Sequence, residues 1–273
     1  MKAVLRATWV IAYRDLLRFI QDRPRLFGSF AMPLLFLIIF GAGFNRIIGA
    51  LAPGVDFIQF MYPGIIAMTV LMNSLMSGLS IVWDREFGFL REVLVAPLSR
   101  TGIVLGKVTG SSVIAIGQGL VMLALAPIIG VKIDFILVLK LIPLLLVISI
   151  TLSGLGILMA SRMRSQQGFQ VLMQIIIMPL IFLSGVFFPV NNVPVWLEVV
   201  SKFNPLTYGV DAIRQVFLNG NMSAVAGVSG DSGYALGVTI FGHTMGIIED
   251  ALVMAVLGVI LLSLAIWSFS KQE

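Results

Sequence analysis

The stretch Leu141-Ile-Pro-Leu-Leu-Leu-Val-Ile-Ser-Ile-Thr-Leu-Ser-Gly-Leu-Gly-Ile-Leu-Met-Ala-Ser161 contains no charged residue and lies between Lys140 and Arg162. A helix of about 20 apolar residues is long enough to cross the hydrocarbon layer of a bilayer. This stretch therefore predicts a membrane-spanning helix. Five other stretches have the same character, so the sequence predicts six spans. We place them at about 26–48, 57–82, 104–130, 137–161, 167–189 and 249–270.

The composition predicts an all-α integral membrane protein. Of the 273 residues, 59% are hydrophobic and 11% are charged, whereas soluble domains have about 45 to 50% apolar and about 25% charged residues. The chain has no cysteine and a single histidine, His243. These counts exclude a disulfide framework, a thiolate metal site and a multi-histidine metal centre. We expect no metal and no cofactor to be bound by this chain.

The positive charges predict the orientation of the chain. The formal net charge is +5, and in a membrane protein such an excess sets orientation, so we expect no nucleic-acid partner. If the N-terminus is cytoplasmic, the cations on the outer side are only Arg46, Lys132, Lys140, Lys202 and Arg214. The positive-inside rule then predicts a multi-pass protein of the cell membrane with both termini in the cytoplasm. We reject residues 234–248 as a seventh span, because this short stretch is broken by glycines.

Residues 1–24 predict an amphipathic helix at the membrane surface. Apolar side chains recur at helical spacing on one face: Leu5, Trp9, Ala12, Leu16 and Ile20. Charged side chains gather on the other face: Arg14, Asp15, Arg18 and Asp22. Such a helix lies at the headgroup boundary. Two interpretations remain open: the helix is only a membrane anchor, or its charged face also binds a cytoplasmic partner.

The predicted spans contain almost no ionisable residues. Lys107 and Lys140 lie near span ends, where a lysine side chain can extend to the interface. A proton relay through the bundle therefore lacks its parts. Sodium can still bind to the carbonyls of broken helices, so an ion-coupled secondary transporter remains an alternative.

No nucleotide-binding loop is recognisable. The nearest candidate, Gly102-Ile-Val-Leu-Gly106-Lys107-Val108, has the wrong spacing and lacks the Ser or Thr that holds magnesium. With Gly110, its glycines instead predict close helix packing. The cytoplasmic segments are also too short for a nucleotide domain. We expect a transport subunit that is not an enzyme, with any ATP hydrolysis on a separate ATPase subunit.

Residues 84–98 predict a short cytoplasmic helix between the second and third spans. The segment reads Asp84-Arg-Glu-Phe-Gly-Phe-Leu-Arg-Glu-Val-Leu-Val-Ala-Pro-Leu98 and mixes charged with large apolar residues. Its proline prevents one unbroken helix into the third span. Its apolar residues indicate burial against a partner or against the bundle itself.

Residues 190–248 predict an outer segment that begins with two short helices. Pro194 can open the first helix, in which Glu198 and Lys202 stand four residues apart. Asn204 then caps a second helix that starts at Pro205. Neither helix is long enough to span. We expect them at the outer interface, where Trp196 and Tyr208 are the aromatic residues.

These two segments carry a family resemblance. The stretch 84–99, the later Phe182-Leu-Ser-Gly-Val-Phe-Phe-Pro189, and the sequence Asn204-Pro-Leu-Thr-Tyr-Gly-Val-Asp-Ala-Ile-Arg214 resemble ABC type-2 permeases of the daunorubicin or multidrug exporter group. The resemblance covers the whole chain as a single transmembrane domain, 1–273. It implies pairing with a second copy or a related permease, and docking of cytoplasmic ABC ATPase subunits that bind ATP and Mg.

The same resemblance assigns candidate residues. The coupling helix and the N-terminal connecting helix beside it would contact the ATPase through Asp84, Arg85, Glu86, Gly88, Leu90, Arg91, Glu92, Arg14 and Arg18. Outer re-entrant helices would contain Trp196, Asn204, Pro205, Tyr208, Asp211 and Arg214.

Polar stripes along the second and fifth spans are candidates for a substrate pathway. Their members, with two nearby aromatic residues, are Thr69, Asn73, Ser77, Gln170, Gln174, Phe182 and Phe188. Such stripes either bond helix to helix or line a pathway, and the resemblance implies that spans two and five face a cavity. The function predicted is the permease subunit of an ATP-driven exporter of a hydrophobic or amphipathic compound, drug-like or lipid-like. Export of a polysaccharide or glycolipid is the alternative within the family.

Overall fold

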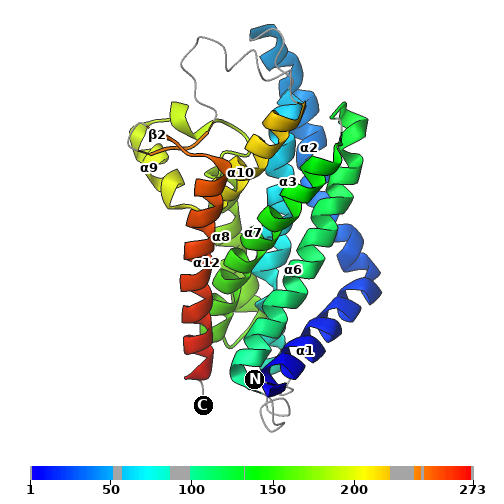
Figure 1. Ribbon diagram of the computed structural model, residues 1–273, viewed down its shortest axis with the longest axis vertical. Coiled ribbons are helices and arrows are strands. Elements are labelled where there is room, and N and C mark those ends of the chain that lie inside the picture. The colour runs from blue at the N-terminus through cyan, green and yellow to red at the C-terminus, as the bar shows by residue number, and fades with distance from the viewer. Residues whose placement is uncertain are drawn as a thin grey trace.

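The protein is a bundle of long helices in a computed structural model that describes residues 2–51, 57–86, 99–131, 133–221, 237–240 and 243–271 (Figure 1). The long helices are α1 (Lys2–Gln21), α2 (Arg23–Leu51), α3 (Phe57–Met76), α6 (Arg100–Leu125), α7 (Phe135–Arg162), α8 (Gln166–Phe182) and α12 (Ile247–Ser270). The shorter elements are α4 (Leu79–Glu86), η1 (Ala126–Ile129), η2 (Val190–Asn192), α9 (Val195–Phe203), α10 (Pro205–Asn221), β1 (Thr239–Ile240) and β2 (His243–Thr244).

Five helical segments among the described residues are long and apolar enough to cross a membrane: Arg23–Asn45, Phe57–Glu86, Arg100–Ile129, Phe135–Arg162 and Ile247–Ser270. Their length and hydropathy confirm the expectation of an all-α membrane protein. The expected span at 167–189 is shorter than predicted, because α8 ends at Phe182. The chain then turns through Gly185, whose φ of +81° suits glycine. The number of spans stays a prediction, since α8 has only 17 residues.

The second span is also interrupted. We expected a continuous helix at 57–82, but α3 ends at Met76 and α4 begins at Leu79. At this break, the backbone around Gly78 comes very close to the backbone of α7 at Gly156. A Cβ added at Gly78 would collide with the carbonyl oxygen of Gly156, and one added at Gly156 would collide with that of Leu75. Glycine at both positions lets the two backbones touch, and the break places α4 beside α7.

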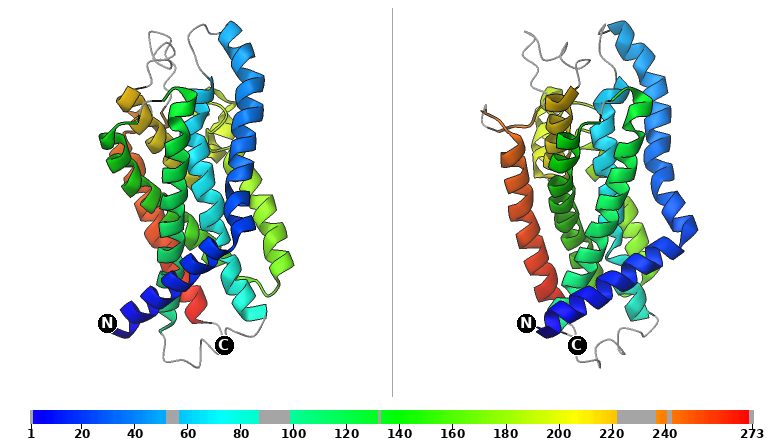
Figure 2. Two further views of the ribbon diagram at one scale, coloured as in Figure 1. Left: turned by 90° about the vertical axis from the view of Figure 1, so that its right-hand side faces the viewer. Right: turned by 45° about the vertical axis from the view of Figure 1, so that its right-hand side comes forward.

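The two ends of the bundle differ. At one end α1 runs obliquely across the other helices, close to the end of α12 (Figure 2). The guanidinium of Arg100, at the start of α6, donates a hydrogen bond of 2.5 Å to the carbonyl of Ser270. The opposite end carries α9, α10 and the antiparallel strands β1 and β2 (Figure 1).

The two short helices of the outer segment are confirmed. Pro194 is the N-cap of α9, and Asn204 separates α9 from α10. Asn204 accepts a hydrogen bond from the backbone N–H of Leu206 at 2.9 Å and donates one to the carbonyl of Leu180 at 2.7 Å. The Asn204 side chain therefore fixes the start of α10 onto the end of α8.

Gly102, Gly106 and Gly110 of α6 form the surface on which α1 packs, and we call this surface the seat of α1. This contact confirms the prediction of close helix packing. A Cβ added at Gly102 would lie 2.8 Å from Cβ of Ala7, and one added at Gly106 would lie 2.8 Å from Cβ of Ile11. Contacts this short require glycine, so the spacing of these residues brings the two backbones together. This contact holds α1 against the bundle.

Candidate functional site

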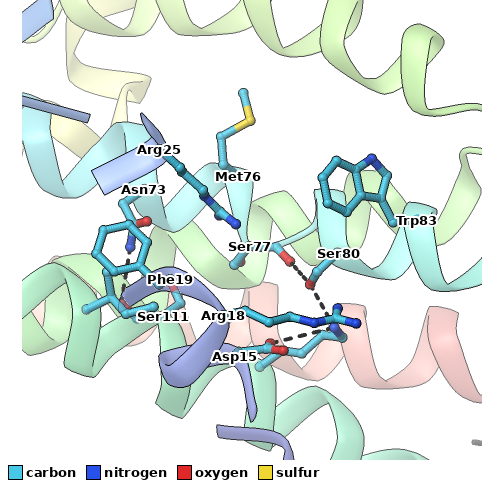
Figure 3. Close-up of a pocket in the computed structure, with 12 residues that line it drawn as sticks. Asp15, Arg18, Phe19, Arg25, Asn73, Met76, Ser77, Ser80, Trp83 and Ser111 are labelled. Atoms are coloured by element: carbon cyan, nitrogen blue, oxygen red, sulfur yellow. Dashed lines mark hydrogen bonds and ion pairs between the residues drawn. The ribbon is translucent and has the colours of Figure 1, made fainter. Parts of the chain in front are cut away.

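A cluster of buried and partly buried charges joins α1, α4 and α6 at the end of the bundle where α1 lies. The carboxylate of Asp84 lies 3.3 Å from the ammonium of Lys107 and 3.3 Å from the guanidinium of Arg14. Lys107 also lies 3.7 Å from Asp15 and donates a hydrogen bond of 2.7 Å to the hydroxyl of Ser80. Figure 3 shows Asp15 and Ser80 converging from their separate helices. We call Asp15, Arg14, Asp84 and Lys107 the inner cluster.

The burial of Lys107 corrects one expectation. We expected its side chain to extend to the interface, but Lys107 is 2% exposed. Asp84, at 6% exposed, lies beside it. Burying a charge is costly unless it is paired and hydrogen-bonded, and the two carboxylates and Ser80 supply those partners. Lys107 is therefore a structural cation that connects α6 with α1 and α4.

Three consecutive residues at the end of α4 bind different helices. Asp84 joins α1 and α6 as described above. The guanidinium of Arg85 donates to the carbonyls of Ser161 at 3.4 Å and Met163 at 2.7 Å, at the end of α7. The carboxylate of Glu86 accepts the N–H of Gln166 at 2.9 Å, at the start of α8. The end of α4 is thus a junction of four helices.

The remainder of the predicted coupling helix, including Gly88, Leu90, Arg91 and Glu92, lies outside the described residues. The contribution of those residues to ATPase contact stays a prediction. Asp84 was assigned to the same contact, and its carboxylate is turned into the bundle rather than toward an exposed surface. The contribution of Asp84 to ATPase contact therefore also stays a prediction.

The charged face of α1 is turned toward the bundle only in part, because Arg14 and Asp15 are partly buried while Arg18 and Asp22 are exposed. Arg14 pairs with Asp84 and Asp15, and Arg18 lies 3.9 Å from Asp84. Trp9 and Ile20 are exposed, as expected for a face in contact with lipid. Ala12 was assigned to the same apolar face, but it is buried against Gly110. The described contacts of the charged face are made with the bundle, and contact with a cytoplasmic partner stays a prediction.

The two predicted polar stripes do not face each other within one chain. Thr69 is buried and donates to the carbonyl of Ile65 in its own helix at 2.9 Å. Asn73 donates to the carbonyl of Ser111 in α6 at 3.5 Å. Gln170 and Gln174 instead lie on the exposed side of α8. For Asn73 the contacts favour helix-to-helix bonding.

The aromatic residues assigned to the pathway lie at the end of α8. Phe182 is partly exposed, and its ring lies 5.1 Å from the ring of Phe187. Phe187 in turn contacts Phe36 and Phe40 of α2, at 5.6 and 5.0 Å between ring centroids. Phe188 is partly buried against the core. These rings connect α2 with the turn that follows α8.

A second buried cluster lies at the opposite end, in α10 and α12. The amide of Gln215 donates to the carboxylates of Asp211 at 3.2 Å and Asp250 at 3.1 Å. Asp211 also accepts the N–H of Val238 at 2.7 Å. Arg214 donates to the carbonyl of Gly185 at 2.6 Å and lies 4.2 Å from the centre of the Phe60 ring. We call Asp211, Arg214, Gln215 and Asp250 the outer cluster.

Burial governs the charges of this outer cluster. It raises the pKa of Asp211, against the opposing effects of the Val238 N–H and the nearby Arg214. Burial also lowers the pKa of Arg214 to about 10, although the charge of Asp211 opposes this change. Within the described residues, no group of three His, Asp or Glu side chains is arranged to hold a metal ion.

The other residues assigned to outer helices are divided between surface and core. Trp196 is exposed, consistent with an interfacial position. Tyr208, which we also expected at the interface, is buried, and its hydroxyl donates to the carbonyl of Lys202 at 2.7 Å. Pro205 begins α10. Whether α9 and α10 re-enter the membrane stays a prediction.

Sequence reasoning missed Lys107, Gln215 and Asp250 as site residues. A usable signal existed for Lys107, because it is a single charge within a long apolar run and such a charge generally has a partner inside the protein. Asp250 resembled an ordinary acidic residue in the first turn of a helix. Its neighbours in α10 lie far away in sequence, so no local pattern identified the pair.

The family described as "ABC-2 type transporter" matches residues 6–218. The chain belongs to this family. It is therefore the membrane permease subunit of an ABC transporter rather than an enzyme.

Individual relatives agree with this membership. A relative in Cyanophora paradoxa, named "Putative transport permease ycf38", is 34% identical over 209 residues, which cover 73% of this permease and 71% of the relative. The Escherichia coli (strain K12) protein "Probable multidrug ABC transporter permease YbhR" is 34% identical over 168 residues, covering 61% and 45%. "Nodulation protein J" of Rhizobium leguminosarum bv. trifolii is 26% identical over 195 residues, covering 71% and 74%.

Proposed function

We propose that this permease exports a hydrophobic or amphipathic compound, drug-like or lipid-like, from the cytoplasm, driven by ATP hydrolysis on a separate ABC ATPase subunit. The chain has no recognisable nucleotide-binding loop of its own. The name of the Escherichia coli relative, a multidrug permease, supports this substrate class. The orientation that fits this role has both termini in the cytoplasm of the cell, with the inner cluster near the inner face of the cell membrane.

The observation that carries the proposal is the junction formed by Asp84, Arg85 and Glu86. These residues begin the predicted coupling helix at 84–98 and bind four different helices. A force applied to that segment by an ATPase would reach α1, α6, α7 and α8 together. Contacts between packed helices tend to rearrange between discrete states rather than deforming smoothly. The junction is thus suited to convert closure of an ATPase into movement of the whole bundle.

The exposed face of α8 supports pairing with a second copy or a related permease. Gln170 and Gln174 are exposed there, and glutamine amides facing lipid hydrocarbon would be left without hydrogen-bond partners. Such groups are retained where they face a partner helix or a water-filled path. We propose that two copies face each other across this side of α8, and that its glutamines and Phe182 line the pathway between them.

Purification from its own membrane tests the proposal. In a mild detergent, the permease is expected to co-purify with an ATP-binding-cassette subunit, and the complex is expected to hydrolyse ATP. Proteoliposomes containing the complex should then export an amphipathic dye only when ATP is present. Uphill transport by the permease alone, driven by a sodium or pH gradient without nucleotide, would contradict the proposal and favour a secondary transporter.

A further inference from the structure

A small cavity lies beside the inner cluster, between α1, the break from α3 to α4, and α6 (Figure 3). Its volume is about 50 Å³. A single water needs about 10 to 15 Å³ measured in this way, whereas pockets for drug-sized ligands usually have about 300 to 1,000 Å³. The cavity therefore has room for a group of a few atoms, but not for a whole drug-like molecule.

The charge of the cavity favours an anion. Its lining contains three cationic side chains, Arg18, Arg25 and Lys107, and one carboxylate, Asp15. Lys107 is already satisfied by the inner cluster. Arg25 forms no ion pair with any described residue, and its guanidinium lies over the ring of Phe19 at 5.8 Å. Arg18 has one carboxylate contact, at the long distance of 3.9 Å. Both guanidinium groups thus keep donors for an additional anion.

Neutral donors complete the cavity. The hydroxyl oxygen of Ser77 is shielded from solvent and has no hydrogen-bond partner among the described residues. A buried hydroxyl without a partner costs free energy, which a bound acceptor would recover. Figure 3 shows Ser77 beside Ser80, with Arg18 and Arg25 directed toward the same space. Two guanidinium groups and a hydroxyl form the donor set that a tetrahedral oxyanion requires.

The surroundings of the cavity indicate where such an anion comes from. Phe19, Met76 and Trp83 form an apolar part of the lining, and Trp83 is 38% exposed. Tryptophan at the surface of a membrane protein is typical of the headgroup level. The exposed Trp9 and Ile20 place the outer face of α1 at the same boundary. An anion attached to acyl chains can therefore enter the cavity with its chains against the apolar rim.

We propose that this cavity binds the phosphate group of an anionic phospholipid of the inner leaflet. Arg18 and Arg25 hold the phosphate oxygens, Ser77 donates its hydroxyl, and Trp83 and Met76 contact the lipid beyond the phosphate. A lipid bound here contacts α1, α3 and α6 at once, so it stabilises the seat of α1. The site needs no ATP and no transported compound, and its failure would leave the proposed export function unaffected.

A binding assay on the full chain in a non-ionic detergent tests the site. Dioleoyl phosphatidylglycerol carrying a fluorescent acyl chain is titrated against the purified permease, and phosphatidylcholine with the same chains is the reference lipid. We expect saturable binding of phosphatidylglycerol, with an affinity at least about tenfold above that of phosphatidylcholine, because phosphatidylcholine has the same phosphate but also a cationic choline, which the cations Arg18, Arg25 and Lys107 repel. Equal affinity for the two lipids would overturn the proposal.

Variants and soluble anions locate the binding. Arg25→Gln and Ser77→Ala should each weaken phosphatidylglycerol binding, whereas the matched control Arg23→Gln, an exposed cation of the same helix outside the cavity, should leave it unchanged. Unchanged binding in Arg25→Gln, or equal losses in Arg25→Gln and Arg23→Gln, would overturn the assignment. Inorganic phosphate and glycerol 1-phosphate should compete only weakly. If either binds as tightly as phosphatidylglycerol, the lipid source is wrong.

Discussion

The inner and outer clusters both contain buried charges, yet they are built differently. In the inner cluster, Asp84 and Asp15 each lie within 4 Å of a cationic side chain. In the outer cluster, Asp211 and Asp250 share the neutral amide of Gln215, and neither forms an ion pair with a described residue. The inner carboxylates are thus held by direct ion pairs, whereas the outer carboxylates are held by neutral donors, with the charge of Arg214 acting on Asp211 from a longer distance.

The outer cluster also contains unused polar atoms. Nε of Arg214 and Oδ1 of Asp250 are shielded from solvent and have no hydrogen-bond partner among the described residues. Unsatisfied buried groups make a polar network easier to rearrange, while satisfied ones make it rigid. We infer that the inner end of this permease is a firm joint that transmits movement. By the same reasoning, we expect the outer cluster to hold α10 against α12 less rigidly.

The largest expected effect comes from removing the central cation of the inner cluster. Lys107→Met leaves the buried Asp84 and the partly exposed Asp15 with fewer partners, so the free energy of unfolding should fall by about 3 kcal/mol or more. Thermal unfolding in detergent measures this loss. Adding Asp84→Asn to Lys107→Met should restore part of the stability, because one uncompensated carboxylate is removed. Equal stability of Lys107→Met and the unaltered chain would contradict the claim that the inner cluster stabilises the packing of α6 against α1 and α4.

A smaller loss is expected from the outer cation. Arg214→Met removes the bond to the carbonyl of Gly185 and the contact with the Phe60 ring. Asp211 keeps the N–H of Val238 and the amide of Gln215. The loss should therefore be about 2 kcal/mol, below that of Lys107→Met in the same unfolding assay. If Arg214→Met lowers the stability more than Lys107→Met does, the outer cluster contributes more to stability than the inner one, contrary to this account.

The seat of α1 offers a test that changes no charge. Gly106→Ala places a Cβ 2.8 Å from Cβ of Ile11 and 2.9 Å from the carbonyl oxygen of Thr8. We expect it to lower the free energy of unfolding by about 1 to 2 kcal/mol and to loosen α1. Gly117→Ala is the control on the same helix, since no atom lies within 4 Å of an added Cβ there. Gly117→Ala should be neutral or slightly stabilising. If Gly106→Ala and Gly117→Ala had equal effects, close packing of α1 against Gly106 would not contribute to stability.

The smallest expected effect is a dependence on pH at the outer end. Burial raises the pKa of Asp211, so the folded chain holds this proton more tightly than the unfolded chain does. The contribution of Asp211 is greatest below its unfolded pKa of about 3.9 and is lost as pH rises through the folded pKa. Arg214 and Gln215 from α10, Asp250 from α12 and the Val238 N–H face this carboxyl.

The comparison with Asp211→Asn isolates that dependence. The stability of the unaltered chain relative to this variant should fall as pH rises from about 4 toward neutrality. Thermal unfolding midpoints of both proteins, measured across that range in detergent, give the difference directly. If the unaltered chain instead becomes more stable relative to Asp211→Asn as pH rises, the folded protein favours the ionised form of Asp211. The two clusters would then not differ in how they treat their carboxylates.

Local features of the fold were predictable from the sequence. Pro194 and Asn204 mark the limits of α9 and α10, because capping and proline geometry act within a few residues. The spacing of Gly102 and Gly106 alone predicted a close contact between helices. The apolar runs gave the long helices, although the break near Gly78 was not visible, because it depends on Gly156 in another helix.

The partners within the clusters were not predictable in the same way. Arg14, Asp84 and Lys107 come from three helices, and no local period specifies how α1 crosses the bundle. Asp211 and Asp250 likewise meet only because α10 packs on α12. The assignment of Thr69 and Gln170 to one pathway combined a residue that is buried inside the bundle with one that is exposed on its surface.

The ratio of molecules transported to ATP hydrolysed tests most directly whether the junction at the end of α4 couples this permease to its motor. The complex with its ATPase subunit is reconstituted in proteoliposomes, unaltered or with Glu86→Gln, which weakens the bond from Gln166 N–H to that side chain. The account predicts continued ATP hydrolysis and a transport-to-hydrolysis ratio lowered by about tenfold, with the matched surface change Arg23→Gln having no effect. An unchanged ratio in Glu86→Gln would contradict it.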